Sequence, residues 1–235
     1  MKPTISVIIP ALNEEKNIAS TIQNVLLGIG DKFNDYEIIV FNDCSTDRTG
    51  AIIEELATAN KKIKVIHNEK TMGFGYNYRK GVELSRYDYI SMIPGDNEIS
   101  LDSIKEMYDA IGKADMVIPY TVNYWVRPIH RQFLSWFFTK ILNFLFKLKL
   151  RYYNGPVIHK SEIIKSIQLS TNSFAFQAEA LVKLIKSGRS FIQVEMFLNK
   201  KKYGKSKAFR LKNIIGVLRA VIVLFLDVYL FKKFR

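Results

Sequence analysis

Short apolar runs rich in β-branched residues alternate with segments of helical periodicity over the first 120 residues. The runs predict strands, and several of the segments between them open with Asn, Asp or Ser residues that can cap a helix. The alternation predicts an α/β fold with a mostly parallel central sheet flanked by helices. The predicted strands are Ile5–Ile9, Tyr36–Phe41, Ile63–His67, Tyr89–Ile93 and Met116–Ile118, and the predicted helices are Glu14–Leu27, Asp47–Ala57, Gly75–Leu84 and Leu101–Ile111.

The pattern changes after Arg127, where the polar positions narrow to a stripe. Residues 131–148 form a helix-length run dominated by Phe, Leu, Ile and Trp, and a second apolar run covers residues 214–231. As a helix the second run would span about 27 Å, just under the roughly 30 Å hydrocarbon core of a bilayer, and it contains Arg219 and Asp227. We therefore expect two amphipathic helices that lie in a membrane interface rather than cross it.

Positive charge is concentrated in the same half of the chain. The formal net charge is +13, and residues 116–161 carry seven Lys or Arg and no acid, while residues 199–235 carry eleven against Asp227 alone. A basic surface that follows nucleic-acid phosphates is usually polar, whereas these charges interleave with aliphatic and aromatic runs. We therefore expect an anionic membrane surface as a partner and no nucleic acid.

The cysteine content and the first residues bear on location. A single cysteine, Cys44, excludes an internal disulfide framework and a cysteine-based zinc site. The apolar run after Met1 is too short for the hydrophobic region of a signal peptide. The expected location is the cytoplasmic face of a membrane, with the protein peripheral or anchored in the interface.

The loops after the first two predicted strands hold unusual chemistry. Ligands of parallel α/β sheets bind beyond the carboxyl ends of the strands. Pro10–Glu15 reads PALNEE and Phe41–Thr49 reads FNDCSTDRT, and Asn and Asp side chains at such strand ends can hydrogen-bond a base and a ribose. Taken alone, each loop has a simpler interpretation, in which Asn13, and Ser45 or Thr46, merely cap helices.

The third loop is rich in glycine. Asn68–Gly81 reads NEKTMGFGYNYRKG, in which glycines would allow a nucleotide to approach the backbone closely. Gly73 and Gly75 could equally be only a turn and a helix start.

The fourth loop follows a strand and carries two acids. Tyr89–Glu98 reads YISMIPGDNE, with Asp96 and Glu98 separated by one residue. Oxygen ligands at this spacing suit Mg²⁺ or Mn²⁺ bound to a diphosphate. The alternative is that the two acids decorate a turn before the next helix.

In this order the four loops resemble the motifs of family 2 glycosyltransferases: Pro-x-Tyr-Asn-Glu, Val-Asp-Asp-Gly-Ser-x-Asp-Gly-Thr, Asn-x-Gly-x-Gly-x-x-x-x-x-Gly and Asp-x-Asp. The resemblance implies the GT-A fold, which is Rossmann-like, a nucleotide-sugar donor, and Mg²⁺ or Mn²⁺ held by Asp96 and Glu98. The chain departs from the motifs in that Leu12 replaces an aromatic residue, Asn42 an Asp, Cys44 a Gly, and Pro94 the first Asp of the metal site. The implied donor contacts are Pro10, Leu12, Glu14, Asn42, Asp43, Gly73 and Gly95.

Four later segments resemble the branch typified by dolichyl-phosphate mannosyltransferase. This resemblance implies that Arg127 and Arg131 act with Asp96 in catalysis, and that Lys201 and Lys207 lie over the donor diphosphate. Because Arg127 and Arg131 are four residues apart, they would share one face if the following helix extends back to include both. They could instead anchor an interfacial helix to lipid, and the two lysines could belong to a polybasic patch. The segments are VRPIHRQFLS at 126–135, NGPVIHK at 154–160, FAFQAEAL at 174–181 and KKKYGKSK at 200–207.

The resemblance implies a hexosyltransferase that moves a sugar, with inversion, from a GDP- or UDP-sugar onto a polyprenyl phosphate of the dolichyl or undecaprenyl type. The expected domain covers residues 1–208, with a nucleotide-sugar-binding half at 1–120 and an acceptor half at 121–208, followed by a membrane-associating helix within 209–235. One alternative is a hydroxyl acceptor in glycan assembly, which needs a base, and Glu179 is the only acid of the acceptor-side helix. Another is a membrane-associated scaffold that lost catalysis with the Asp that Pro94 replaces.

Overall fold

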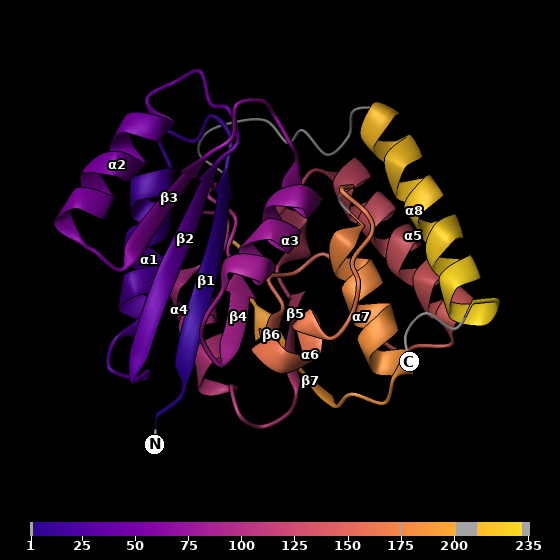
Figure 1. Ribbon diagram of the computed structural model, residues 1–235. Helices are drawn as coiled ribbons and strands as arrows, with labels where there is room; N and C mark the ends of the chain where they lie inside the picture. The colour runs from indigo at the N-terminus through magenta and orange to yellow at the C-terminus, as the bar shows by residue number, and fades with distance from the viewer. Residues whose placement is uncertain (1, 174, 201–210, 232–235) are drawn as a thin grey trace.

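The computed structural model describes residues 2–173, 175–200 and 211–231 (Figure 1). A seven-stranded sheet with the order β3-β2-β1-β4-β6-β5-β7 lies at its centre. All pairings are parallel except those of β6, which runs antiparallel to both β4 and β5. The mostly parallel α/β architecture predicted from the sequence is confirmed.

The strands are β1 Thr4–Ala11, β2 Asp35–Asn42, β3 Ile63–His67, β4 Tyr89–Met92, β5 Met116–Thr121, β6 Ile158–Lys160 and β7 Phe191–Met196. The helices are α1 Ile18–Ile29, α2 Thr49–Ala59, α3 Phe74–Leu84, α4 Leu101–Asp109, the 3₁₀ turn η1 Tyr124–Val126, α5 Ile129–Phe146, α6 Ser161–Lys165, α7 Phe176–Lys186 and α8 Leu211–Tyr229. The five predicted strands are present, and β6 and β7 were not predicted. Helix α1 begins four residues later than predicted because the amides of Asn17 and Ile18 bond the carbonyl of Glu14 and close a turn there.

Each face of the sheet packs against its own set of helices (Figure 1). Side chains alternate between the faces along a strand, so in β1 Val7 and Ile9 pack with α1, α2 and α4, whereas Ile8 packs with α3 and α7. Both faces of β1 are therefore buried, which explains its nearly continuous apolar sequence.

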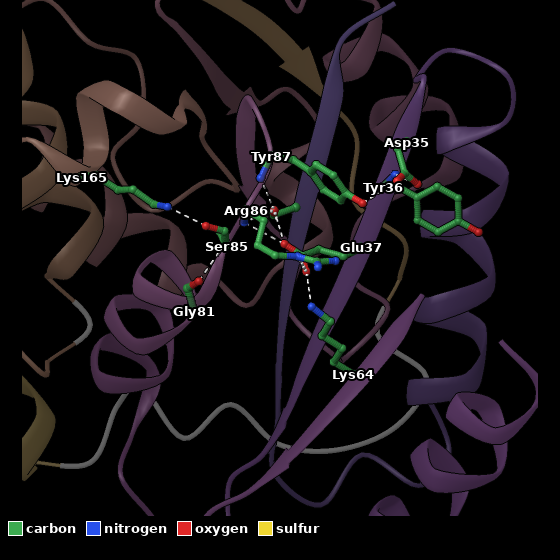
Figure 2. Close-up of polar contacts among 10 residues, drawn as sticks. Asp35, Tyr36, Glu37, Lys64, Gly81, Ser85, Arg86, Tyr87 and Lys165 are labelled. Atoms are coloured by element: carbon green, nitrogen blue, oxygen red, sulfur yellow. Dashed lines mark hydrogen bonds and ion pairs between the residues drawn. The ribbon is translucent and has the colours of Figure 1, made fainter. Parts of the chain in front are cut away.

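A buried carboxylate joins the amino-terminal edge of the sheet to the end of α3 (Figure 2). Glu37 of β2 accepts hydrogen bonds from Ser6 Oγ at 2.8 Å, the Arg86 amide at 2.8 Å and Lys64 Nζ at 2.7 Å. Burial alone would raise the pKa of Glu37, but these donors outweigh it and hold that pKa below its ordinary value of 4.5. The ionised Glu37 thereby fixes the chain between α3 and β4.

We expect acid to destabilise the protein through His159, which is buried in β6, an interior strand of the sheet. Burial lowers the pKa of His159 from 6.5 to about 3, with Gln177 opposing the shift more weakly. Below pH 6.5 His159 is therefore protonated in the unfolded chain, whereas in the folded chain it stays neutral down to about pH 3. The free energy of unfolding should fall by up to about 1.4 kcal/mol per pH unit across this window.

Urea unfolding at a series of pH values tests this expectation. His159→Gln should remove this part of the acid dependence, while the control His130→Gln, at an exposed histidine, should keep it. An acid dependence that is the same in both variants would contradict the assignment to His159.

Helices α5 and α8 pack on each other at their carboxyl ends. The rings of Phe146 and Tyr229 stack with centroids 6.2 Å apart, and Tyr229 Oη donates to the Leu145 carbonyl at 2.8 Å. The two helices occupy the positions predicted from the apolar runs, each shifted by two or three residues. None of the helices described, α5 and α8 included, is long and apolar enough to cross a membrane.

Candidate functional site

The loops after β1 and β2 are cross-linked to each other at the carboxyl edge of the sheet. The Asn13 amide donates to Ser45 Oγ at 3.0 Å, Asn13 Oδ1 accepts from the Thr46 amide at 2.8 Å, and the Glu14 amide donates to Thr49 Oγ1 at 2.8 Å. Asn13 takes a left-handed backbone conformation with φ 57° and lies before the α1 N-cap, Asn17. The capping interpretation of Asn13 is therefore wrong, and its side chain holds two expected donor loops together.

Asn42, at the end of β2, is engaged by its neighbours. Its Oδ1 accepts from the Ser45 amide at 3.1 Å, and its Nδ2 lies 2.9 Å from His67 Nδ1. His67 Nε2 in turn lies 2.8 Å from Glu54 Oε1. An Asn42 amide that donates to Nδ1 requires the His67 tautomer with its proton on Nε2. Asn42 therefore shapes the turn that follows β2.

Asp43 organises the glycine-rich loop. One carboxylate oxygen accepts from the Met72 amide and from Asn68 Nδ2, both at 2.8 Å, and the other accepts from the Gly73 amide at 3.0 Å. Gly73 has a φ of 90°, a backbone conformation that residues with a side chain rarely adopt, so glycine is favoured at this position. The second and third expected donor loops thus meet at Asp43.

Gly95 brings the fourth loop against the end of β1. Its amide donates to the Pro10 carbonyl at 3.1 Å, and its carbonyl accepts from Thr21 Oγ1 at 3.0 Å. A Cβ at this position would lie 3.1 Å from the Cβ of Ala11, so the loop and the end of the strand are in close contact here. Leu12 lies half-buried in the turn that follows β1.

Asp96 and Glu98 come just after Gly95 in the fourth loop, and their surroundings differ. Asp96 Oδ1 accepts from the Glu98 amide at 3.3 Å, which is a weak contact. Glu98 Oε1 accepts from Arg127 Nε at 3.0 Å and lies 3.9 Å from a terminal nitrogen of Arg131. The structure therefore brings together Asp96, Glu98 and both predicted arginines.

The route by which the arginines converge differs from the prediction. Helix α5 begins at Ile129, so Arg127 precedes it and ends the 3₁₀ turn η1 in an extended conformation. The two arginines do not share a helix face, and Glu98 joins them instead. Arg127 also donates to Tyr152 Oη at 2.8 Å. Burial would lower the pKa of Arg127, but Tyr152 and Glu98 raise it above its ordinary value, so its charge is fixed.

Residues 198 and 199, which follow β7, lie beside the acids. The Asn199 amide donates to the Glu98 carbonyl at 2.7 Å, and Ile99 pairs with Leu198 in an isolated bridge. Lys201 and Lys207 lie outside the described residues, so their predicted role stays a prediction.

The fit of a metal rests on few protein ligands. Within the described parts of the chain, no group of three or more His, Cys, Asp or Glu side chains could hold a metal ion. The carboxylate of Asp96 is the hard oxygen donor that Mg²⁺ or Mn²⁺ prefers, whereas Glu98 Oε1 is already paired with Arg127 at 3.0 Å. A metal fits here if a bound diphosphate supplies most of the ligands.

Sequence reasoning missed Tyr152, Asn68 and His67 as parts of this site. Asn68 lies within the glycine-rich motif, and its amide joins Asp43 to Asn77 Oδ1 at 2.7 Å. A strand-end position was the available signal for His67. Nothing in the local pattern marks Tyr152, because its contact with Arg127 depends on the path of the chain between α5 and β6.

Comparisons with known proteins give a consistent picture. Residues 6–168 match the family described as Glycosyl transferase family 2. A low-salt glycan biosynthesis hexosyltransferase of Haloferax volcanii is 28% identical over 189 residues, covering 77% of this chain and 44% of that protein. A polyprenol monophosphomannose synthase of Mycolicibacterium smegmatis is 27% identical over 216 residues, covering 86% and 79%. The chain thus spans less than half the length of the first of these relatives.

A solved structure shares the fold. Glucosyl-3-phosphoglycerate synthase of Mycobacterium tuberculosis, in complex with Mn²⁺, UDP and glucosyl-3-phosphoglycerate, superposes with a TM-score of 0.66 at 19% identity. The match covers 96% of this chain and 79% of that one. The fold expected from the resemblance is confirmed.

Proposed function

Because the chain belongs to glycosyl transferase family 2, we propose that it transfers a sugar, with inversion, from a GDP- or UDP-sugar onto a polyprenyl phosphate at a membrane surface. The observation that carries the proposal is the convergence of Arg127 and Arg131 on Glu98, two residues beyond Asp96. Two guanidinium groups that could bind an anionic acceptor therefore lie close to Asp96 of the expected donor site. The polyprenol monophosphomannose synthase relative supports an acceptor of this class.

The donor would lie across the four loops at the carboxyl edge of the sheet. Asp43 and the Asn13–Thr46 cross-link hold the first three loops in place, and Gly95 places Asp96 beside the end of β1. Asp96 would hold Mg²⁺ or Mn²⁺ together with the diphosphate. When bound, the metal stabilises the charge of the departing nucleoside diphosphate.

The acceptor side needs no base if the acceptor is a phosphate. A phosphate monoester is already an anion at neutral pH, so the chain must position it rather than deprotonate it. The guanidinium groups of Arg127 and Arg131 can donate several hydrogen bonds to phosphate oxygens. Glu98 and Tyr152 fix the orientation of Arg127 before the acceptor arrives.

A hydroxyl acceptor would require a base, and the surroundings of Glu179 argue against that role. Glu179 is 4% exposed, and its carboxylate accepts from Lys183 Nζ at 2.7 Å and from the amides of Ser170 and Thr171. Burial would raise the pKa of Glu179, but these donors hold it below its ordinary value of 4.5. Such a carboxylate is a poor proton acceptor, which favours the phosphate acceptor.

Product formation tests the proposal. The protein is incubated with a panel of UDP- and GDP-sugars, Mn²⁺ and a polyprenyl phosphate, and lipid extracts are analysed by mass spectrometry. We expect a lipid-linked sugar with one member of the panel. A protein that binds vesicles and a nucleoside diphosphate but forms no product with the polyprenyl phosphate, or with a glycan acceptor added in its place, would support the scaffold alternative.

The membrane part of the proposal is supported by an apolar surface on α5 and α8. On α5, Ile129, Phe133 and Trp136 are 76%, 60% and 56% exposed, and on α8, Leu218 and Ile222 are 59% and 63% exposed. Large exposed apolar residues on neighbouring helices mark an interaction surface. The exposed bases Lys140, Lys147, Lys149 and Arg219 on and beside these helices suit anionic lipid.

We expect the protein to float with vesicles that contain anionic phospholipid at low salt, and to float less as salt is raised. The double variant Phe133→Ser/Trp136→Ser should lose most of this binding because it removes two bulky apolar anchors. The control is Leu27→Ser on α1, which is 51% exposed on the other side of the sheet. Flotation of the double variant to the same extent as the control would contradict the assignment of this surface.

A further inference from the structure

The amino-terminal end of α3, next to the glycine-rich loop, rests on the segment before α7. A Cβ at Gly75 would lie 2.7 Å from the carbonyl carbon of Asn172, so the two backbones are in direct contact. The ring of Phe74 lies 6.5 Å from that of Phe176, the first residue of α7. The amides of Met72 and Gly73, which Asp43 binds, come immediately before this contact. Residues 170–173 therefore pack against the end of the glycine-rich loop, which is the third of the expected donor loops.

Glu179 holds this segment in place. Its two oxygens accept from the Ser170 amide, Ser170 Oγ at 2.8 Å and the Thr171 amide at 3.0 Å. Lys183, one turn further along α7, donates to Glu179 at 2.7 Å and to the Gln168 carbonyl at 2.8 Å. The conformation of residues 168–171 therefore depends on this buried pair.

Helix α8 contacts both α7 and the segment 170–173 before it. Asp227 of α8 lies 3.6 Å from Lys183 Nζ, and the side chains of Lys183 and Asp227 are 3% and 10% exposed. A Cβ at Gly216 would lie 3.6 Å from Ser173 Cβ, so the first half of α8 lies against the segment 170–173. Figure 1 shows α8 beside α7, on the side away from β1. Lys183 therefore pairs with two carboxylates: Glu179, which holds residues 170–171, and Asp227 of α8.

The far end of α3 is held independently. Lys165 Nζ donates to the Ser85 carbonyl at 2.5 Å, and the Arg86 amide donates to Glu37 (Figure 2). A change at Lys183 or Asp227 should therefore loosen the amino-terminal end of α3 and leave its carboxyl-terminal end in place.

From these contacts we infer that Asp227, Lys183 and Glu179 are positioning residues for the donor loop, through which the seating of α8 sets the affinity for the nucleoside diphosphate. The inference rests on the proposed function for the identity of the ligand. It gives α8 a second role besides surface binding, because a membrane that holds α8 in place would strengthen donor binding. By linkage, a bound donor would strengthen membrane binding by the same factor.

Hydrogen exchange on the full chain without ligand tests the positioning directly. Asp227→Asn keeps the shape of the side chain and removes its charge, and should speed exchange in a peptide covering residues 70–78 at least several-fold. A peptide covering residues 81–90 should not change. Asp227→Glu should restore slow exchange, and Arg219→Gln, on the exposed side of α8, should behave as wild type.

Ser170→Ala is a second variant that avoids the buried helix. It removes one of the bonds to Glu179 at an exposed residue, and should loosen the same peptide to a smaller extent. Unchanged exchange at residues 70–78 in folded Asp227→Asn and in Ser170→Ala would overturn the inference.

Calorimetry with UDP and GDP in the presence of Mn²⁺ supplies the functional readout. Asp227→Asn should raise the Kd of the nucleotide that binds wild type by roughly tenfold. Vesicles of anionic phospholipid should lower that Kd for wild type and not for Asp227→Asn. If wild type binds neither nucleotide, the proposed function fails while the exchange experiment still decides the positioning. A Kd that is equal in wild type and Asp227→Asn would contradict the inference.

Discussion

Asp96→Ala is expected to abolish metal-dependent binding of the nucleoside diphosphate and to lower turnover by about 10³-fold. Asp96 lies just beyond β4 at the ligand-binding edge of a parallel sheet, and Gly95 fixes the loop there against Pro10. Because Pro94 supplies no carboxylate, a metal held at Asp96 would take most of its ligands from the diphosphate, and metal binding without nucleotide should be weak. Calorimetry with UDP and GDP, with and without Mn²⁺, measures each contribution.

A matched control is Asp102→Asn, at an exposed carboxylate in the first turn of α4. It should keep metal-dependent binding, apart from a small loss of helix stability. Metal-dependent binding in Asp96→Ala at the wild-type level would remove the metal assignment and the leaving-group role built on it.

Arg131→Ala is expected to lower turnover with polyprenyl phosphate by about 10²-fold and to leave the Kd of the nucleotide unchanged. Replacing Arg131 disturbs Glu98 less than replacing Arg127 would. A terminal nitrogen of Arg131 lies 3.9 Å from Glu98 Oε1, whereas Arg127 Nε bonds this oxygen at 3.0 Å. Removing Arg127 would also leave the half-buried Glu98 without its main partner. Initial rates against acceptor concentration separate loss of acceptor binding from loss of turnover.

Lys113→Ala, at an exposed base between α4 and β5, is the control for loss of positive charge. Glu98→Gln separates the two roles open to Glu98. It should weaken metal-dependent nucleotide binding if Glu98 is a metal ligand, and impair acceptor use alone if it holds Arg127. Wild-type turnover in Arg131→Ala would contradict the acceptor assignment.

The five strands predicted from the sequence were readable because buried parallel strands are short apolar runs between helical segments. Strand β6 was missed because it has three residues and pairs antiparallel between β4 and β5, so neither its length nor its neighbours produce a local signal. The start of α1 was predicted too early because Asn13 and Glu14 look like helix-start residues. In the structure they cross-link two loops, and the same side-chain chemistry serves both purposes.

The sequence placed the candidate loops at one edge of the sheet but could not say which side chains pair. Asp43 meets Gly73, and Glu98 meets Arg127, across about thirty residues of chain, so the pairings depend on how the loops fold over the edge. Arg127 and Arg131 would share a helix face only if α5 extended back to both, but α5 begins at Ile129, and Glu98 brings the two arginines together instead. As the only acid of the acceptor-side helix, Glu179 is the base that a hydroxyl acceptor would need, whereas its burial beneath residues 170–171 gives it a structural role instead.

Transfer to a polyprenyl phosphate is tested most directly by comparing this acceptor with two hydroxyl acceptors. With the cognate nucleotide sugar and Mn²⁺, a polyprenyl phosphate and the corresponding polyprenol are offered separately, and a glycan with free hydroxyls is offered as a third acceptor. The products are analysed by mass spectrometry and ³¹P NMR. We expect a sugar phosphodiester from the polyprenyl phosphate alone, with the anomeric configuration of the donor inverted. Transfer to the glycan hydroxyl, with none to the phosphate, would contradict it.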